Sequence, residues 1–183
     1  MTAVVLVSVL VIGAGAVFLF NRLVRLRNQV RNGWADIDVQ LQRRHDLVPQ
    51  LVAAVKGYAG HEHALLAAVT ELRARALATP APAQLGAIEG SLQGALGKLV
   101  LLAEAYPDLK ASANFSQLQQ GLVDVEDHLQ YARRFYNGAV RDYNDATQRF
   151  PDLLVARAFA FQPSEFFETD DASRAAVQVG LAR

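Results

Sequence analysis

The chain lacks cysteine altogether, and its 183 residues carry no net charge at pH 7. Without thiols it has no disulfide, no thiolate metal site, no cysteine nucleophile and no cysteine for N-terminal lipid attachment. A thiol-free chain suits either side of a membrane, so the compartment stays open. Eighteen basic and eighteen acidic side chains cancel. The sequence therefore lacks the global positive field that is typical of nucleic-acid-binding proteins, and we expect no nucleic-acid partner.

Spacings that support catalysis or metal binding in helical proteins are also missing. A carboxylate-bridged di-metal centre needs Glu three residues before His. The residues that stand three places before the four histidines are Gln42, Tyr58, Gly60 and Val125. A zinc-protease helix needs His-Glu-x-x-His, whereas His61-Glu62-His63 places its two imidazoles on different sides of a helix. The sequence thus predicts no enzymatic activity, no metal, no cofactor and no small-molecule substrate.

One segment keeps a different interpretation open. Residues 36–63 hold three of the four histidines, several carboxylates and a pair of arginines in a helical pattern. The alternative hypothesis is an exported or membrane-bound enzyme or metal-binding protein that uses this cluster. The residues it would draw on are His45, Asp46, His61, Glu62 and His63.

The N-terminus carries an uncharged apolar run, residues 3–20. As a helix it spans about 27 Å, close to the roughly 30 Å of a bilayer core. Four arginines without an acidic residue among them follow it; these are Arg22, Arg25, Arg27 and Arg31. By the positive-inside rule, the run is a single-pass anchor with its N-terminus outside and the remaining chain in the cytoplasm. We expect the four arginines to lie on anionic lipid headgroups, unless setting the orientation is their whole role.

A cleaved signal peptide is the alternative for this run. Ala14-Gly15-Ala16 supplies a small-residue cleavage site, and cleavage after Ala16 would release an exported bundle. Only Met1 and Thr2 precede the run, so the positively charged region of a signal peptide is missing. The sequence therefore favours an uncleaved anchor.

A first long helical pattern follows the anchor, from about residue 22 to residue 78. Pro49 should kink this helix without ending it, and a Thr-Pro-Ala-Pro stretch closes it. The apolar positions that mark one seam are Val30, Trp34, Ile37, Leu41, Val48, Leu51, Val55, Tyr58, Leu65, Val69 and Leu72.

Two further patterns predict helices over residues 85–105 and 115–150, with a short one over 152–161. Asn114 and Gln117 resemble an N-cap and its capping box. Residues of the third pattern step by three and four, which favours coiled-coil packing at shallow angles. They are Phe115, Leu118, Leu122, Val125, Leu129, Ala132, Tyr136, Ala139, Tyr143, Ala146 and Phe150.

No strand alternation occurs, so the predicted class is all-α. We expect an antiparallel helical bundle of three long helices and a short fourth, with an N-terminal transmembrane helix. The predicted divisions are an anchor over residues 1–21, a cytoplasmic bundle over 22–167 and a flexible tail over 168–183.

Polar residues interrupt the seam of the first helix at Arg44, between Leu41 and Val48, and at Glu62, between Tyr58 and Leu65. The third helix carries others on or beside its own seam. The candidate polar-layer or interaction residues are Arg44, His45, Asp46, Glu62, Tyr136, Asn137, Tyr143 and Asn144. Such layers commonly fix register and partner choice at a cost in stability. A recognition surface is the functional alternative.

Four blocks of the sequence closely resemble the LemA family. They are NQVRNGWADIDVQLQRRHDLVPQLVAAVKGYAGHE, LAEAYPDLKASANFSQLQ, ARRFYNGAVRDYN and FP, in that order. The resemblance runs from the apolar N-terminus to about Phe167. It implies a bacterial single-pass protein of the inner membrane with a mostly cytoplasmic helical bundle, and it implies no reaction or cofactor.

The leading hypothesis is a non-enzymatic, membrane-anchored scaffold or interaction protein of the bacterial cell envelope. Its expected partners are the lipid bilayer and further copies of itself, with another envelope membrane protein as an additional candidate. Anchoring raises the effective concentration, and long heptad helices offer ready interfaces.

Overall fold

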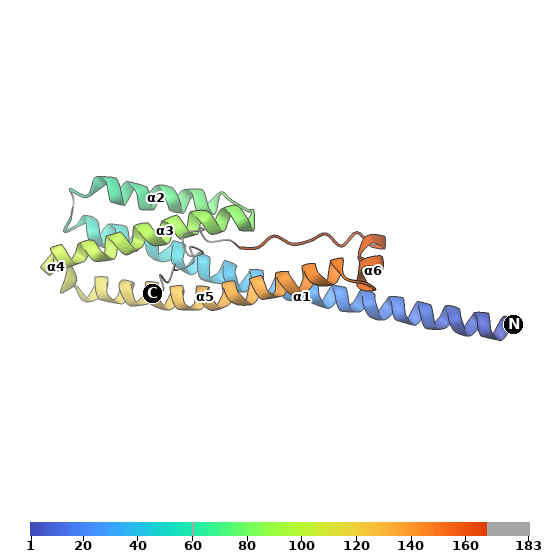
Figure 1. Ribbon diagram of the computed structural model, residues 1–183. Helices are drawn as coiled ribbons and strands as arrows, with labels where there is room; N and C mark the ends of the chain where they lie inside the picture. Colours follow the sequence, from blue (N-terminus) through green and yellow to red (C-terminus); the bar gives the residue numbers. More distant parts are fainter. Residues whose placement is uncertain (60, 168–183) are drawn as a thin grey trace, which may run out of the picture. The chain divides into compact units, whose positions relative to one another are not determined.

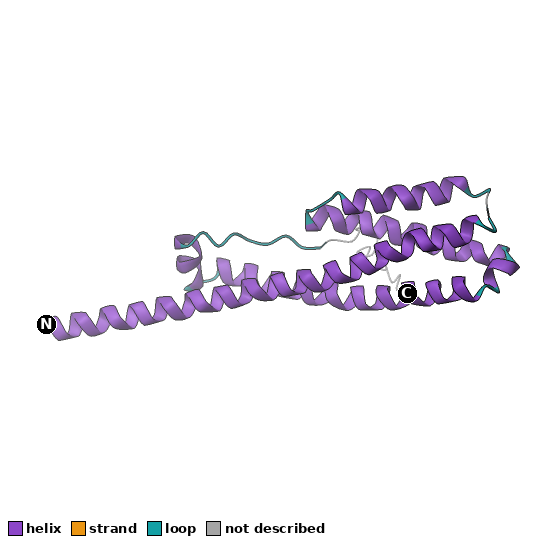
Figure 2. Cartoon of the chain, turned by 180° about the vertical axis from the view of Figure 1, so that it is seen from behind, coloured by secondary structure: helices purple, strands orange, loops and turns teal. Residues whose placement is uncertain are grey.

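The computed structural model describes residues 1–59 and 61–167, and this part of the chain contains helices but no strand (Figure 2). The all-α prediction is confirmed. The chain divides into two compact units. Unit 1 comprises Met1–Asp46 and Gly121–Phe166, and unit 2 comprises Leu47–Gln120 together with Phe167, the last described residue. The predicted tail over residues 168–183 lies outside the described residues.

Helix α1, Thr2–Lys56, is a single helix of 55 residues that joins the apolar run to the bundle without a break (Figure 1). Pro49 lies inside it, and the helix continues past it as expected. The most apolar 18-residue window of α1 has a mean hydropathy of 2.8, and none of it is buried inside the protein. This run is long and apolar enough to cross a membrane.

The predicted continuation of the first helix to residue 78 is wrong. The helix ends at Lys56, and a separate helix α2, His63–Leu77, follows after a turn. Gly57 directly follows Lys56 and favours the break, since a glycine costs a helix about 1 kcal/mol relative to alanine. Tyr58, placed on the seam by its spacing, is exposed in this turn.

Unit 2 contains α2 packed on α3, Pro82–Leu102, followed by the 3₁₀ turn η1, Ala103–Ala105, and the short α4, Pro107–Lys110. The second predicted helix is thus confirmed, and it ends before Pro107. Its buried leucines are Leu85, Leu92, Leu96 and Leu99. Each such side chain contributes about 1.5–3 kcal/mol by leaving water. α3 with η1 is also long and apolar enough to span a membrane, and one third (33%) of its window is buried inside the protein.

Helix α5, Ala113–Gln148, is the third predicted helix, and its heptad seam is buried from Phe115 to Ala146 with Leu122 half-buried. Two details differ from the prediction. The helix begins before Asn114, and Ser112 caps it by accepting a long 3.5 Å hydrogen bond from the backbone N–H of Phe115. Phe150 stands beyond the helix end and is 74% exposed, so the seam stops before it.

In unit 1, α1 and α5 run antiparallel. The contacts that fix their register join Trp34 to Tyr136 and Arg44 to Glu126. Arg22 pairs with Asp152, which lies beyond the C-terminal end of α5. Position numbers rise along α1 as they fall along the α5 segment, which requires opposite directions. The predicted antiparallel arrangement is therefore confirmed within this unit.

The chain closes with α6, Asp152–Ala158, and an extended segment. α6 lies beside α1 where the anchor run leaves the bundle (Figure 1). We call residues 162–166 the strap, since they follow α6 without regular structure and lie along α5. α5 binds the strap through Tyr136, Tyr143 and Asn144, which are polar-layer candidates of the sequence.

Candidate functional site

Three polar side chains of α5 hold the backbone of the strap. The Tyr136 hydroxyl donates to the carbonyl of Glu165 at 2.8 Å, and the Tyr143 hydroxyl donates to the carbonyl of Gln162 at 2.9 Å. Asn144 Nδ2 donates to the Ser164 carbonyl at 2.9 Å, and the Ser164 N–H donates to Asn144 Oδ1 at 2.8 Å. These candidate polar-layer residues of α5 thus bind a segment that the sequence analysis did not single out.

Burial changes the acidity of both phenols. It raises the pKa of Tyr136 above its ordinary value, and the nearby Glu165 carboxylate adds to that rise. Burial also raises the pKa of Tyr143, although Arg27 and Arg31 partly oppose the effect. Both hydroxyls are therefore neutral donors at physiological pH, which is the state that their bonds to strap carbonyls require.

Arg44 is the largest fully buried side chain of the described residues, with 0% of it exposed. Its Nη2 pairs with Glu126 Oε2 of α5, and the Glu126 side chain is 19% exposed. Sequence reasoning missed Glu126, which lies next to the seam residue Val125. The antiparallel register identifies it: Arg44 lies ten residues after Trp34 on α1, and Glu126 lies ten residues before Tyr136, the partner of Trp34, on α5.

The remaining polar-layer candidates differ in their burial. His45 is buried in unit 1, while Asp46 is exposed and accepts a 3.0 Å hydrogen bond from Gln42 Nε2. Asn137 is half-buried on α5. Glu62 belongs to unit 2, where it precedes α2 and makes no side-chain capping bond.

Metal-ligand geometry does not arise among the described residues. No group of three or more His, Asp or Glu side chains within residues 1–59 and 61–167 lies close enough to hold an ion. His61 and His63 are exposed around the turn before α2. His128 Nδ1 lies 2.6 Å from the Asp124 carbonyl oxygen on its own helix, which is a local contact and not a ligand pair.

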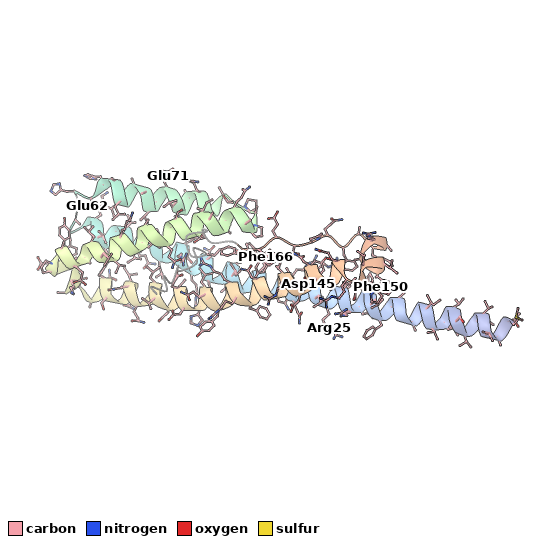
Figure 3. All side chains as sticks on the ribbon, viewed as in Figure 1. Arg25, Glu62, Glu71, Asp145, Phe150 and Phe166 are labelled. Carbon is pink, nitrogen blue, oxygen red and sulfur yellow. The ribbon has the colours of Figure 1, made fainter. Side chains whose placement is uncertain are left out.

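Two of the four arginines that follow the apolar run contact the C-terminal part of unit 1. Arg22 forms an ion pair with the buried carboxylate of Asp152, the first residue of α6. The Arg27 guanidinium lies 5.0 Å from the centroid of the Phe161 ring, a cation–π geometry. Arg25 and Arg31 are exposed (Arg25 is labelled in Figure 3).

Close helix approach explains the glycine in the Asn-Gly-Trp part of the family-like block. A Cβ at Gly33 would lie 3.1 Å from Tyr136 Cα and 3.1 Å from Phe135 Cδ1. Trp34 stacks at a tilt on Tyr136 with 5.5 Å between ring centroids. The residue without a side chain therefore brings α1 against α5 at the level where Tyr136 reaches the strap.

An open groove lies between α1 and α5 in unit 1, with a volume of about 340 Å³. Val39, Tyr131 and Phe135 line it, and Tyr131 is 68% exposed. The Arg134 guanidinium lies 4.6 Å from the Tyr131 ring centroid. Asp36 and His128 supply polar groups to the same groove. We call Val39, Tyr131 and Phe135 the groove triad; they form the exposed apolar surface of this face.

Comparisons with known proteins give relatives along most of the chain. A sequence model of the LemA family matches residues 33–180. Magnetosome protein MamQ of Magnetospirillum gryphiswaldense is 23% identical over 174 residues, covering 81% of this chain and 64% of that protein. Magnetosome protein MamQ 2 of Paramagnetospirillum magneticum is 21% identical, with 81% and 64% covered. Protein LemA of Metamycoplasma hominis is 25% identical over 167 residues, covering 89% of this chain and 75% of that protein.

The matches show which part of the chain is shared with these relatives. The family match begins at Gly33 and includes the α5 residues that hold the strap. The chain spans 64% of the length of the two MamQ proteins, so their own lengths include more than this chain.

Proposed function

The chain belongs to the LemA family, and from this premise we propose that it is a non-enzymatic scaffold of the bacterial cell envelope, held at the inner membrane and self-associating there. One observation carries the proposal: α1 runs unbroken from the uncharged apolar run into the bundle. A helix that continues from lipid into protein fixes the bundle next to the membrane.

The anchor role is supported by what the apolar run leaves exposed. None of its most apolar window is buried by the rest of the protein. Burying such side chains in lipid contributes about 25 cal/mol for each Å² removed from water. Eighteen helical residues without a charge also match the thickness of a bilayer core. Membrane insertion is therefore the state in which this segment is stable.

Orientation follows from the four arginines. Arg22, Arg25, Arg27 and Arg31 follow the run with no acidic residue among them, and this bias favours a cytoplasmic bundle. The chain has no cysteine, so a cysteine introduced at the exposed Val123 is the single thiol that a maleimide can label. Its labelling shows on which side of the membrane the bundle lies. We expect a membrane-impermeant maleimide to label Val123→Cys only after the inner membrane of spheroplasts is opened. Labelling in sealed spheroplasts would show the opposite orientation.

Self-association is supported by the groove triad. Val39, Tyr131 and Phe135 are large apolar residues, and all three are exposed beside one groove. Clustered exposed apolar surface marks interaction sites more often than isolated exposed residues do. Tethering to a membrane raises the effective concentration of copies, so a weak interface suffices.

The test is chemical crosslinking in intact cells with a tag after Arg183, followed by purification and mass spectrometry. We expect a ladder of self-multiples. Tyr131→Asp combined with Phe135→Asp should remove the ladder, and Leu77→Asp, an equally exposed apolar position on α2, should leave it. A lone monomer from the unchanged chain would overturn self-association. One dominant foreign membrane protein in the crosslinked band would replace it with a scaffold for that protein.

A further inference from the structure

Helix α6 is held at the level where the uncharged run ends. The Phe20 ring lies 4.9 Å from the ring of Phe159 and 5.7 Å from that of Phe161, both in edge-on geometry. Arg22 pairs with Asp152 one turn of α1 or less from Phe20. These contacts at both ends of α6 place it beside residues 20–22 of α1 (Figure 1).

Large apolar side chains in and around α6 are exposed. Phe150 is 74% exposed, Leu154 60% and Phe159 61%. Val155 and Ala156, by contrast, are buried. We call Phe150, Leu154 and Phe159 the α6 collar. Three such residues within ten positions make a patch that a water-exposed surface seldom carries.

The α6 collar continues the apolar surface of the anchor. Val17 and Phe18 of α1 are exposed, and the Phe20 ring beyond them touches Phe159. Lipid that surrounds Phe20 therefore reaches Phe159. Figure 3 shows the labelled Phe150 beside the stretch of α1 where the anchor run leaves the bundle.

Charges around the collar suit a lipid headgroup layer. Arg25, Arg149 and Arg157 are exposed, and the carboxylate of Asp152 is paired with Arg22. Arginines can bury their stems in apolar surroundings while the guanidinium stays among headgroups. Asp142 and Asp145 line a groove that Arg22 and Arg149 also line.

From these observations we propose that the α6 collar inserts into the headgroup–acyl boundary beside the anchor, so that unit 1 contacts the bilayer at a second place. An apolar face flanked by arginine is the composition of interfacial membrane helices. Aromatic side chains are also enriched at this depth. The inference rests on the proposed function only in requiring that α1 spans the membrane.

The test uses three single-cysteine variants of the full chain, which needs no prior cysteine removal. Leu10→Cys reports on the anchor, Leu154→Cys on the collar and Val123→Cys on an exposed apolar position of α5. Each carries an environment-sensitive fluorophore in vesicles of phosphatidylcholine and phosphatidylglycerol. We expect a nitroxide-bearing lipid to quench the labels at Leu10 and Leu154 several-fold more strongly than the label at Val123.

The outcomes separate the two proposals. Quenching at Leu10 with a Leu154 label as accessible to aqueous iodide as the Val123 label would overturn the collar and leave the anchor intact. No quenching at Leu10 would overturn the anchor and the collar together. A Leu154 label shielded from both quenchers would also overturn the inference, because a second protein surface would then cover the patch.

A second measurement guards against an effect of the label itself. With the fluorophore at Arg157→Cys, we replace Phe150 and Leu154 by Ser. Lipid quenching of the Arg157 label should fall toward that of Val123 and iodide quenching should rise. Val123→Ser in the same labelled background should change neither. Unchanged lipid quenching after removal of both collar side chains would contradict the proposal.

Discussion

Asn144 binds Ser164 through both atoms of its side-chain amide, donating from Nδ2 at 2.9 Å and accepting at Oδ1 at 2.8 Å. The amide thus satisfies both the carbonyl and the N–H of Ser164, as the backbone of a paired strand would do. With Tyr136 and Tyr143 it binds backbone groups of the strap at Gln162, Ser164 and Glu165. α5 therefore holds the strap by hydrogen bonds to its backbone.

Removing this amide should loosen the strap. We expect Asn144→Ala to lower the free energy of unfolding by about 1–3 kcal/mol, since it deletes two hydrogen bonds and leaves Ser164 groups unpaired. Urea unfolding of the full chain in detergent micelles measures the change. Gln130→Ala, an exposed substitution on the same helix, is the matched control. Equal midpoints for the two variants would show that the strap contributes nothing.

Alkaline pH should weaken the same contacts. The pKa of each phenol is raised in the folded protein above its ordinary 10.0, so the unfolded chain loses these protons first. The stability they contribute is present below about pH 10 and is lost as pH rises through the folded values. Thermal unfolding between neutral and strongly alkaline pH measures this loss.

A double variant without the two phenols tests whether they cause the loss of stability at alkaline pH. Tyr136→Phe combined with Tyr143→Phe should lower stability at neutral pH and flatten the decline above about pH 10. Gln130→Ala, an exposed substitution on the same helix that removes no phenol, should leave the decline as it is. An unchanged slope in the double variant would assign the alkaline loss to other groups.

Two glycines should respond differently to the same added methyl group. A Cβ at Gly138 meets nothing within 4 Å, so Gly138→Ala should stabilise α5 by up to about 1 kcal/mol. At Gly33 the methyl group meets the Tyr136 backbone, so Gly33→Ala should gain less or destabilise, and Gly33→Leu should destabilise strongly. Urea midpoints compare the variants. Equal gains from both alanines would contradict the close approach of α1 and α5.

The Arg44–Glu126 pair allows a test of whether polar layers set register. Glu126→Ala should cost about 3 kcal/mol, because it leaves a buried guanidinium without this carboxylate. Replacing both residues by Met should be nearly neutral or stabilising, as for other buried ion pairs. If the pair fixes register, crosslinks between two introduced cysteines, one in α1 and one in α5, should become less specific in the double variant. A destabilised double variant with unchanged crosslinks would argue against this role.

The sequence predicted helices well where long periodicity exists. The α5 seam from Phe115 to Ala146 repeats at three and four residues, and packing against the seam fixes the helix that the pattern requires. The uncharged run was equally clear because composition alone defines it. The break after Lys56 was missed because the apolar spacing continues through it, while Gly57 locally favours a turn.

The partners of polar residues were harder to predict. A heptad position shows that Tyr143 faces inward, but it does not show which part of the chain fills the space there. The strap has no periodic pattern, so nothing in the sequence marked it as the acceptor for Tyr136, Tyr143 and Asn144. Glu126 was missed for a related reason, since it is identified only after the register of α1 and α5 is known.

α1 continues without a break through Phe20 and Arg22. The number of residues between the apolar run and α6's contacts therefore fixes which side of the run faces the same way as α6. Each residue of an α-helix turns the chain by about 100° and advances it by about 1.5 Å. A single residue inserted between the run and Arg22 would therefore turn the anchor by more than a quarter circle relative to α6. Two helices that recognise each other inside the bilayer would thus determine which faces of their bundles meet outside it. Because α1 is one unbroken helix, a rotation of its apolar run about the helix axis also rotates the part of α1 that packs in unit 1.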